Sequence, residues 1–240
     1  ARHVVLFDLP AIFDVKAMLE GGAGIRWEPT NGSRIGVLDR SDLTAPVRWF
    51  EMEPFWMFHI LNAFDDGDAV VVDGCRTDRL NAAFGDADPE RAAPPVLHRC
   101  RVDLATGAVT EQQLDDRPGD FPRVNDDRAG ADTRYGYVAA ARRWEGDEVV
   151  FNGFVKHDLH GGTSEAFTYG TDEVAGEAAF APDPTGDGDD AGWLLNIVWD
   201  RAEGTSDLVV VDAPTLEEVA RVHMPRRVPS GFHGNWFAAT

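Results

Sequence analysis

Histidines are the residues of this chain best suited to chemistry, and two of its seven stand out by their surroundings. His59 lies in an aromatic, apolar run, EPFWMFHILNAF, and His233 lies between two glycines in SGFHGNW. A buried imidazole costs free energy unless both ring nitrogens have partners. Taken singly, each favours a core histidine with local hydrogen bonds. The alternative is a metal ligand, and the glycines beside His233 would let the backbone approach closely and aim the ring.

Four of the other five histidines are better explained without a ligand role. His98 lies in a polar strand-like segment, and His223 alternates with apolar residues in another, so both are interpreted as structural. His157 and His160 lie in KHDLHGG and could chelate a metal as an i, i+3 pair. A turn rich in glycine favours exposed, solvated side chains for this pair instead. His3 is too close to the first residue to interpret.

No compact catalytic or metal motif is present. The sequence lacks HExxH, CxxC and GxSxG patterns, a P-loop, and a GxGxxG after a strand. In a propeller, metal ligands would come from the inner strands of different blades, so their spacing should be long and irregular, as it is between positions 59 and 233. The Asp-rich segment 183–193, DPTGDGDDAGW, does not match the ligand register of an EF-hand and is predicted to be a solvated hairpin tip.

The charge of the chain limits its partners. Its 240 residues include 42 acidic and 22 basic ones, a net charge of −20. Such a surface repels phosphate backbones and anionic membranes, which disfavours nucleic acid as a partner. Only Lys16 and Lys156 are lysines. An acidic, lysine-poor surface indicates a halophilic protein, with a GC-rich genome as the alternative explanation.

Other features of composition bear on location and length. Cys75 and Cys100 are too few for a disulfide framework and predict a reducing, cytoplasmic location, with one disulfide between them as the alternative. No apolar run approaches the ~18 residues that cross a bilayer. The chain begins without Met or a signal-peptide layout. This start predicts that the chain is part of a longer protein.

Strand-like segments dominate the chain and predict an all-β fold with few short helices. Short alternating runs such as SRIGVLDR, EVVFNGFVKHDL and GWLLNIVWD are separated by turns rich in Gly, Asp and Pro. The one convincing helical segment is FDVKAMLEGG, which Gly21 and Gly22 would terminate.

A repeat indicates the type of all-β fold. Asp103, Asp158 and Asp212 occupy matching places in three strand–turn–strand segments and are 55 and 54 residues apart. Regular hairpins with a period near 50 residues are typical of a β-propeller with four strands per blade. The chain then holds about four blades, and its abrupt start suggests part of a larger ring. The alternative is that Asp–Gly hairpin turns recur by chance in a β-rich protein.

Four stretches together resemble the carotenoid oxygenase family, which includes carotenoid and apocarotenoid cleavage dioxygenases, lignostilbene dioxygenases and a retinoid isomerase. They are GIRWEPTNGSRIGVLDR, VRWFEMEPFWMFHILNAFDDGDAVVVDGCR, GEAAFAPDPTGDGDDAGWLLNIVWD and LVVVDAPTLEEVARVHMPRRVPSGFHGNW. The resemblance runs nearly end to end. It implies a seven-bladed propeller, of which residues 1–240 would be a single partial domain from the C-terminal half.

The resemblance also implies a cofactor, Fe(II), held by four histidines. The third falls on His59 and the fourth on His233, and the first two would precede residue 1. The family places glutamates behind these ligands to accept the second ring N–H. One matches Glu177, and another falls on Asp120, where Asp replaces the usual Glu and its shorter side chain would lengthen the contact.

The implied reaction is cleavage of a conjugated C=C bond of a carotenoid or apocarotenoid by O2 into two carbonyl products. The apolar polyene would contact aromatic residues that could equally be core: Phe55, Trp56, Phe58, Phe232 and Trp236, of which Phe58 and Phe232 are the leading candidates. With two ligands, the isolated chain is expected to be inactive. Peripheral membrane contact would involve a cap that is partly missing from this chain. The alternatives are cleavage of a stilbene, isomerisation, or a non-catalytic propeller that binds a partner.

Overall fold

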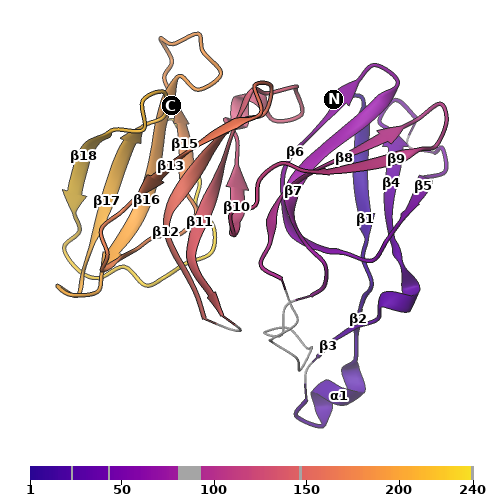
Figure 1. Ribbon diagram of the computed structural model, residues 1–240, viewed down its shortest axis with the longest axis horizontal. Coiled ribbons are helices and arrows are strands. Elements are labelled where there is room, and N and C mark those ends of the chain that lie inside the picture. The colour runs from indigo at the N-terminus through magenta and orange to yellow at the C-terminus, as the bar shows by residue number, and fades with distance from the viewer. Residues whose placement is uncertain (23, 43, 81–92, 146–147, 239–240) are drawn as a thin grey trace. The chain divides into compact units, whose positions relative to one another are not determined.

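The computed structural model describes residues 1–22, 24–42, 44–80, 93–145 and 148–238, in two compact units (Figure 1). One unit is Ala1–Asp116 with Trp144–Val149, and the other is Arg117–Arg143 with Val150–Thr240. In the described part of the chain, antiparallel strands dominate, with one five-residue α-helix and two single-turn 3-10 helices. The all-β prediction with few short helices is confirmed.

The first unit contains two larger sheets and a hairpin. The first sheet has the order β1-β4-β5, with β1 (His3–Asp8), β4 (Ser33–Asp39) and β5 (Arg48–Met52). The second is a four-stranded meander of β6 (Trp56–Asp66), β7 (Ala69–Thr77), β8 (Val96–Asp103) and β9 (Val109–Gln113). The hairpin pairs β2 (Ala11–Phe13) with β3 (Ile25–Trp27), and a 3-10 helix (Pro29–Asn31) follows it.

The predicted helical segment forms α1 (Val15–Leu19) between β2 and β3. Asp14 caps it, because its Oδ1 accepts a hydrogen bond of 2.9 Å from the Ala17 N–H. The chain leaves the helix through Gly21, whose φ of +83° is open to glycine at no steric cost.

The second unit contains two sheets. A four-stranded meander consists of β10 (Gly119–Arg123), β11 (Tyr135–Glu145), β12 (Glu148–Asp158) and β13 (Thr163–Thr168), with a 3-10 helix (Asp126–Arg128) after β10. The five-stranded sheet consists of β14 (Glu173–Val174), β15 (Ala179–Pro182), β16 (Gly192–Asp200), β17 (Thr205–Asp212) and β18 (Glu218–His223). Both β14 and β15 pair with β16.

Each unit has its own apolar core. In the first, buried residues of β4, β5, β7 and β8 pack together, among them Ile35, Phe50, Val70, Val72 and Val102. In the second, the core includes Tyr137, Phe154, Phe180, Leu194 and Val209. A strand that is buried on both faces has apolar residues at consecutive positions, which explains the VVVD sequences in β7 and β17.

The three repeat aspartates end the third strand of their meanders, at the β8–β9, β12–β13 and β17–β18 turns. Each side chain accepts backbone N–H bonds from the turn, for instance 2.7 Å from Gly161 to Asp158. In each turn the residue four positions later has a positive φ: Gly107, Gly162 and Leu216. The repeat is therefore one turn built three times, as the propeller interpretation predicted.

Three expectations need correction or refinement. His157 is not in an exposed turn, because β12 continues to Asp158 and buries it to 5% exposure, so only His160 lies in the turn. The Asp-rich hairpin tip is present between β15 and β16, but it is not simply solvated, because Asp190 Oδ2 lies 2.7 Å from Lys156 Nζ. The alternative of a disulfide does not hold, since Cys75 and Cys100 are both free and buried.

Among the described residues, the structure contains no helix with the length and hydropathy of a membrane span.

Candidate functional site

His59 lies on β6 at an irregular part of the strand. The pairing with β7 shifts on both sides of Ile60, whereas Asn62 and the residues after it pair regularly. Such bulges bend a strand and change the direction of its side chains. His59 is half-buried, and Phe58 and Ile60 on either side are 37% and 44% exposed. The apolar run around His59 is thus only partly core, which removes the main reason to interpret His59 as a core histidine.

A chain of aromatic rings leads to His59 from β3. The ring centroids of Trp27 and Trp56 are 6.4 Å apart, those of Trp56 and Phe58 are 5.2 Å apart, and those of Phe58 and His59 are 6.2 Å apart. Phe58 therefore combines exposure with contact to the imidazole. Phe55, by contrast, is 1% exposed and belongs to the core.

Gly74 of β7 makes room for the backbone at His59. A Cβ atom at this position would lie 2.5 Å from Met57 Sδ and 3.0 Å from the His59 carbonyl oxygen. No side chain larger than hydrogen fits there without a shift of its neighbours. Sequence reasoning did not identify Gly74, although a lone glycine inside the strand sequence VVVDGCR was a signal for it.

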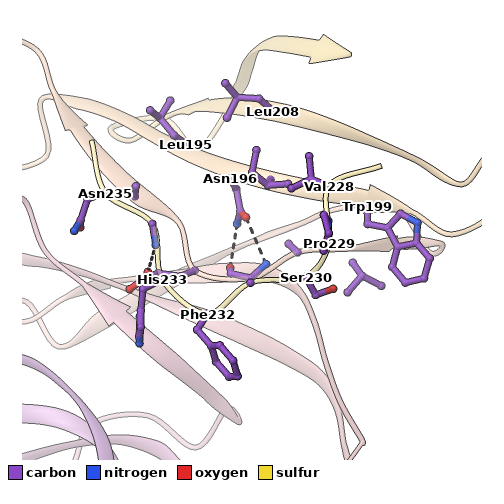
Figure 2. A pocket seen from close by; sticks show the side chains of 18 residues that line it. Leu195, Asn196, Trp199, Leu208, Val228, Pro229, Ser230, Phe232, His233 and Asn235 are labelled. Carbon is purple, nitrogen blue, oxygen red and sulfur yellow. Dashed lines mark hydrogen bonds and ion pairs between the residues drawn. The ribbon is translucent and has the colours of Figure 1, made fainter. Parts of the chain in front are cut away.

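His233 has a different setting. It follows β18 in a segment without regular secondary structure, and its side chain is 54% exposed. Its Nδ1 lies 3.4 Å from Glu177 Oε2, and the same oxygen accepts a 2.9 Å hydrogen bond from the Gly234 N–H (Figure 2). The Glu177 side chain is 5% exposed, so a buried carboxylate faces the imidazole. The structure thus places one of the carboxylates expected behind the ligands, Glu177, beside one of the expected ligands, His233.

The flanking glycines of His233 do not act as expected. Among the described residues, a Cβ at Gly231 or Gly234 would meet nothing within 4 Å, and neither glycine has a positive φ. The prediction that they allow a close backbone approach is wrong for this part of the chain. The ring is aimed by contacts with side chains instead.

Phe121 packs directly on His233, with centroids 5.5 Å apart and ring planes at 78°. Its φ of +51° is rare for a non-glycine residue and costs free energy. The adjacent Asp120 is 5% exposed, and its Oδ1 accepts a 2.9 Å hydrogen bond from the Phe121 N–H. The register of β10 shifts between Asp120 and Arg123. Asp120, proposed from the sequence as a partner of a ligand, therefore holds the strained residue that contacts His233.

Arg123 is a residue that sequence reasoning missed. Its Nη1 lies 3.5 Å from Glu177 Oε1, and its Nη2 donates a 2.6 Å hydrogen bond to Asn235 Oδ1. The only available signal was a basic residue three positions after Asp120 in DFPR. The contacts join positions 54 and 112 residues apart, which no local pattern reveals.

A pocket of about 380 Å³ opens beside His233 within the second unit. Asn196 supports its wall by pairing with both backbone groups of Gly176, at 3.1 and 3.4 Å (Figure 2). Phe232 lines the pocket and is 76% exposed. The lining combines apolar residues with His233 and Glu177, and it comprises residues 174–177, 179, 195–197, 199, 208 and 228–235.

The setting of His233 fits a metal ligand in kind. With Nδ1 of His233 facing Glu177, Nε2 is the nitrogen that would bind a metal, and a carboxylate behind an imidazole is typical of metal-ligating histidines. His59 lies in the first unit and His233 in the second. Within the described residues, no group of three or more His, Cys, Asp or Glu side chains is placed to hold a metal. Either histidine would need further ligands to hold a metal.

Comparison with known proteins identifies relatives over nearly the whole chain. The carotenoid cleavage oxygenase of Mycobacterium tuberculosis is 36% identical over an alignment 229 residues long, which covers 89% of this chain and 44% of that protein. The carotenoid 9,10(9',10')-cleavage dioxygenase of Crocus sativus is 33% identical over an alignment 257 residues long, which covers 97% of this chain and 46% of that protein. The chain thus spans about half the length of the curated relatives it matches.

The fold is shared with solved structures. The crystal structure of cobalt-substituted Synechocystis ACO superimposes with a TM-score of 0.88 at 24% identity, over 99% of this chain and 51% of that one. A family model described as RPE65, retinal pigment epithelial membrane protein, matches residues 1–238. This chain therefore belongs to the family of the retinal pigment epithelial membrane protein and the carotenoid cleavage oxygenases.

Proposed function

We propose that residues 1–240 form a single partial domain, the C-terminal part of a β-propeller dioxygenase that uses non-haem Fe(II). The proposed reaction adds the two atoms of O2 across one conjugated C=C bond of a carotenoid or apocarotenoid and releases two carbonyl compounds. The names of the relatives from Mycobacterium tuberculosis and Crocus sativus support this class of substrate.

The contact between Glu177 and His233 carries the proposal. The buried Glu177 carboxylate, whose Oε2 lies 3.4 Å from Nδ1, would accept a hydrogen bond from an N–H at that nitrogen, which would fix the tautomer and leave Nε2 as the metal-binding atom. We propose that His59 is a second ligand and that two further histidines precede residue 1. Bound Fe(II) would supply a cation with positions open for O2 beside the alkene.

The remaining site residues have roles in binding and orientation. Phe58 and Phe232 are exposed aromatic side chains next to His59 and His233, and we propose that they contact the apolar polyene. Phe121 packs against the His233 ring and limits its rotation. Asp120 keeps Phe121 in its unusual backbone conformation.

Product analysis tests this proposal. The full-length protein, reconstituted with Fe(II), is incubated with an apocarotenoid under ¹⁸O2, and the products are separated and weighed by mass spectrometry. We expect two carbonyl products, each labelled with one ¹⁸O atom, and loss of the polyene absorbance. An intact substrate, or a single isomer of the same mass, would contradict cleavage. We expect no loss of absorbance with the isolated chain.

An exposed apolar patch supports a further proposal, peripheral membrane contact. Phe13, Val15, Met18 and Leu19, at β2 and α1, are all exposed. Clustered exposed apolar side chains mark contact with a partner or a membrane, and substrates of this class dissolve in lipid. Because the net charge is −20, we expect binding to neutral phosphatidylcholine vesicles rather than anionic ones, with a loss in Leu19→Glu.

The composition supports two proposals about the environment. We propose a halophilic protein, because high salt screens the repulsion within a chain of net charge −20. The midpoint of thermal unfolding should then rise as KCl is increased, and a constant midpoint would contradict this. We also propose a cytoplasmic location, which the two free, buried cysteines favour.

A further inference from the structure

We propose that Arg123 is a positioning residue for His233, which acts through Glu177 and Asn235. This inference rests on the proposed function only in taking His233 as a metal ligand. The claim about Arg123 concerns the orientation of an imidazole and can be measured without a metal.

The guanidinium of Arg123 contacts both the carboxylate that faces His233 and the segment that carries His233. Nη1 lies 3.5 Å from Oε1 of Glu177, the carboxylate whose other oxygen faces the imidazole. Nη2 donates a 2.6 Å hydrogen bond to Oδ1 of Asn235, two residues after His233. One side chain of β10 therefore contacts both the carboxylate that faces the ring and the Asn235 side chain, two residues after His233.

Residues 224–238, the segment that carries His233, need contacts of this kind because no strand pairing holds them. We call the contacts of Arg123 with Glu177 and Asn235 a clamp. Residues 224–238 contain no helix or strand, so their backbone order must come from individual contacts that outweigh the loss of conformational entropy. The backbone bonds from this segment to side chains are from Val228 to Ser206, at 3.0 Å, and from Gly234 to Glu177, at 2.9 Å, in the described part of the chain. The second ends on the carboxylate that Arg123 contacts.

Charge compensation gives Arg123 a second effect. The Glu177 side chain is 5% exposed, and a buried carboxylate is costly unless a cation and hydrogen-bond donors surround it. Arg123 and the Gly234 N–H supply both. Asp126, the other carboxylate near Arg123 at 3.1 Å, is 59% exposed and competes weakly. Without Arg123, the buried Glu177 carboxylate would lose its cation, and we expect its side chain to rotate away from His233 toward solvent.

The geometry requires arginine rather than any cation. The fork of a guanidinium presents separate donors to Glu177 and Asn235, whereas a lysine ammonium is a single point charge. Arg123→Lys should therefore keep the charge but lose one of the two contacts, and it should retain only part of the function of Arg123.

A metal-free measurement tests the orientation. The full-length apoprotein is labelled with ¹⁵N-imidazole histidine, and the His233 signals are assigned by their loss in His233→Ala. We expect the Nδ1–H tautomer to dominate in the wild type and to lose its dominance in Arg123→Gln, with Arg123→Lys between them. Arg128→Gln is the matched control, because this arginine lies in the same unit and pairs with Asp189 at 3.3 Å, away from His233. An unchanged tautomer in Arg123→Gln would overturn the inference.

A double-mutant cycle tests the route through Glu177. Co²⁺ affinity of the apoprotein should fall about 10-fold in Arg123→Gln, in the range known for residues behind metal ligands. In a Glu177→Gln background, the same change should cost less, about 2–3-fold, because only the contact with Asn235 is then left to lose. Equal losses in both backgrounds would overturn the inference. If Arg123→Gln does not fold, Asn235→Ala removes one arm of the clamp and should still weaken Co²⁺ binding, and unchanged affinity would count against it.

The two proposals fail in different ways. If His233→Ala leaves Co²⁺ affinity unchanged, the proposed function fails, while the tautomer measurement still judges Arg123. If His233→Ala abolishes binding but Arg123→Gln changes neither tautomer nor affinity, the proposed function stands and the role of Arg123 is rejected.

Discussion

The two histidines singled out by the sequence have contrasting supports. His59 lies on a β-strand whose register, bulge and aromatic neighbours determine its position. His233 lies on an irregular segment, where Glu177 and Phe121 contact the ring itself. The first setting depends on backbone packing and the second on polar and aromatic side-chain contacts. The same proposed ligand role can thus be built from regular structure or from a clamp.

The contrast predicts different sensitivities to mutation. A ligand on a strand should respond to changes that disturb the sheet and therefore alter stability. A ligand on an irregular segment should respond to changes of side-chain charge and hydrogen bonding, with little effect on the fold. The following predictions compare the two cases, beginning with the largest expected effect.

Glu177→Gln should reduce the metal affinity of the full-length protein about 10–100-fold, because the amide no longer provides a carboxylate behind His233. Glu203→Gln, in the exposed β16–β17 turn, is the matched control and should leave affinity unchanged. Isothermal titration of the apoprotein with Co²⁺ gives the comparison. Asp120→Asn should cost less than Glu177→Gln, because Asp120 supports Phe121. The reverse order would show that Asp120 is the more important carboxylate.

Gly74→Ala should destabilise the fold by about 1–3 kcal/mol, because the new Cβ meets Met57 and the His59 carbonyl. Gly234→Ala, beside the other histidine, should change stability by no more than about 0.5 kcal/mol. Urea unfolding of both full-length variants measures the difference. Equal losses of unfolding free energy in the two variants would contradict the distinction between His59, held by strand packing, and His233, held by side-chain contacts.

The repeat turns provide a matched pair of carboxylates, one in each unit. The Arg134 side chain and the Gly161 N–H lower the pKa of Asp158, and bonds from Thr106 lower that of Asp103. A lowered pKa in the folded state adds stability that is present above the unfolded value, near 4, and is lost as the pH falls further. Asp158→Asn should therefore cost about 1 kcal/mol at pH 7, and the difference from wild type should shrink below about pH 4.

Asp103→Asn should have a smaller effect, because Asp103 accepts hydrogen bonds from its turn, whereas Asp158 also accepts hydrogen bonds from the Arg134 side chain. Unfolding midpoints between pH 7 and pH 3 distinguish the two. A larger loss in Asp103→Asn, or a difference that grows as the pH falls, would contradict this explanation of the turns.

The fold could be predicted from sequence because its signals are local. An Asp that caps a turn, with a residue of positive φ four positions later, recurs at Asp103, Asp158 and Asp212 and marks the same connection each time. The short helix was likewise predictable from Asp14, Gly21 and the apolar spacing between them. Both depend on residues within a few positions of one another, which a sequence displays directly.

The site was only partly predictable for the opposite reason. His59 and His233 stand out by their neighbours and could be proposed as ligands from the family motifs, and Glu177 could be proposed from the same motifs. Arg123 became visible only when β10 and the last segment of the chain were placed in space. The burial of His157 was missed because the end of a strand depends on its pairing partner, not on the glycines that follow it.

Iron content of two variants tests the central claim most directly. Full-length His59→Ala and His233→Ala are purified under identical conditions, and bound iron is measured by atomic absorption beside the wild type. His223→Ala is the control, because this histidine of β18 has its Nδ1 2.8 Å from Oδ1 of Asp207 on β17. We predict that His59→Ala and His233→Ala each lose most of the bound iron and that His223→Ala retains it. Unchanged iron in both would contradict the assignment of His59 and His233 as ligands.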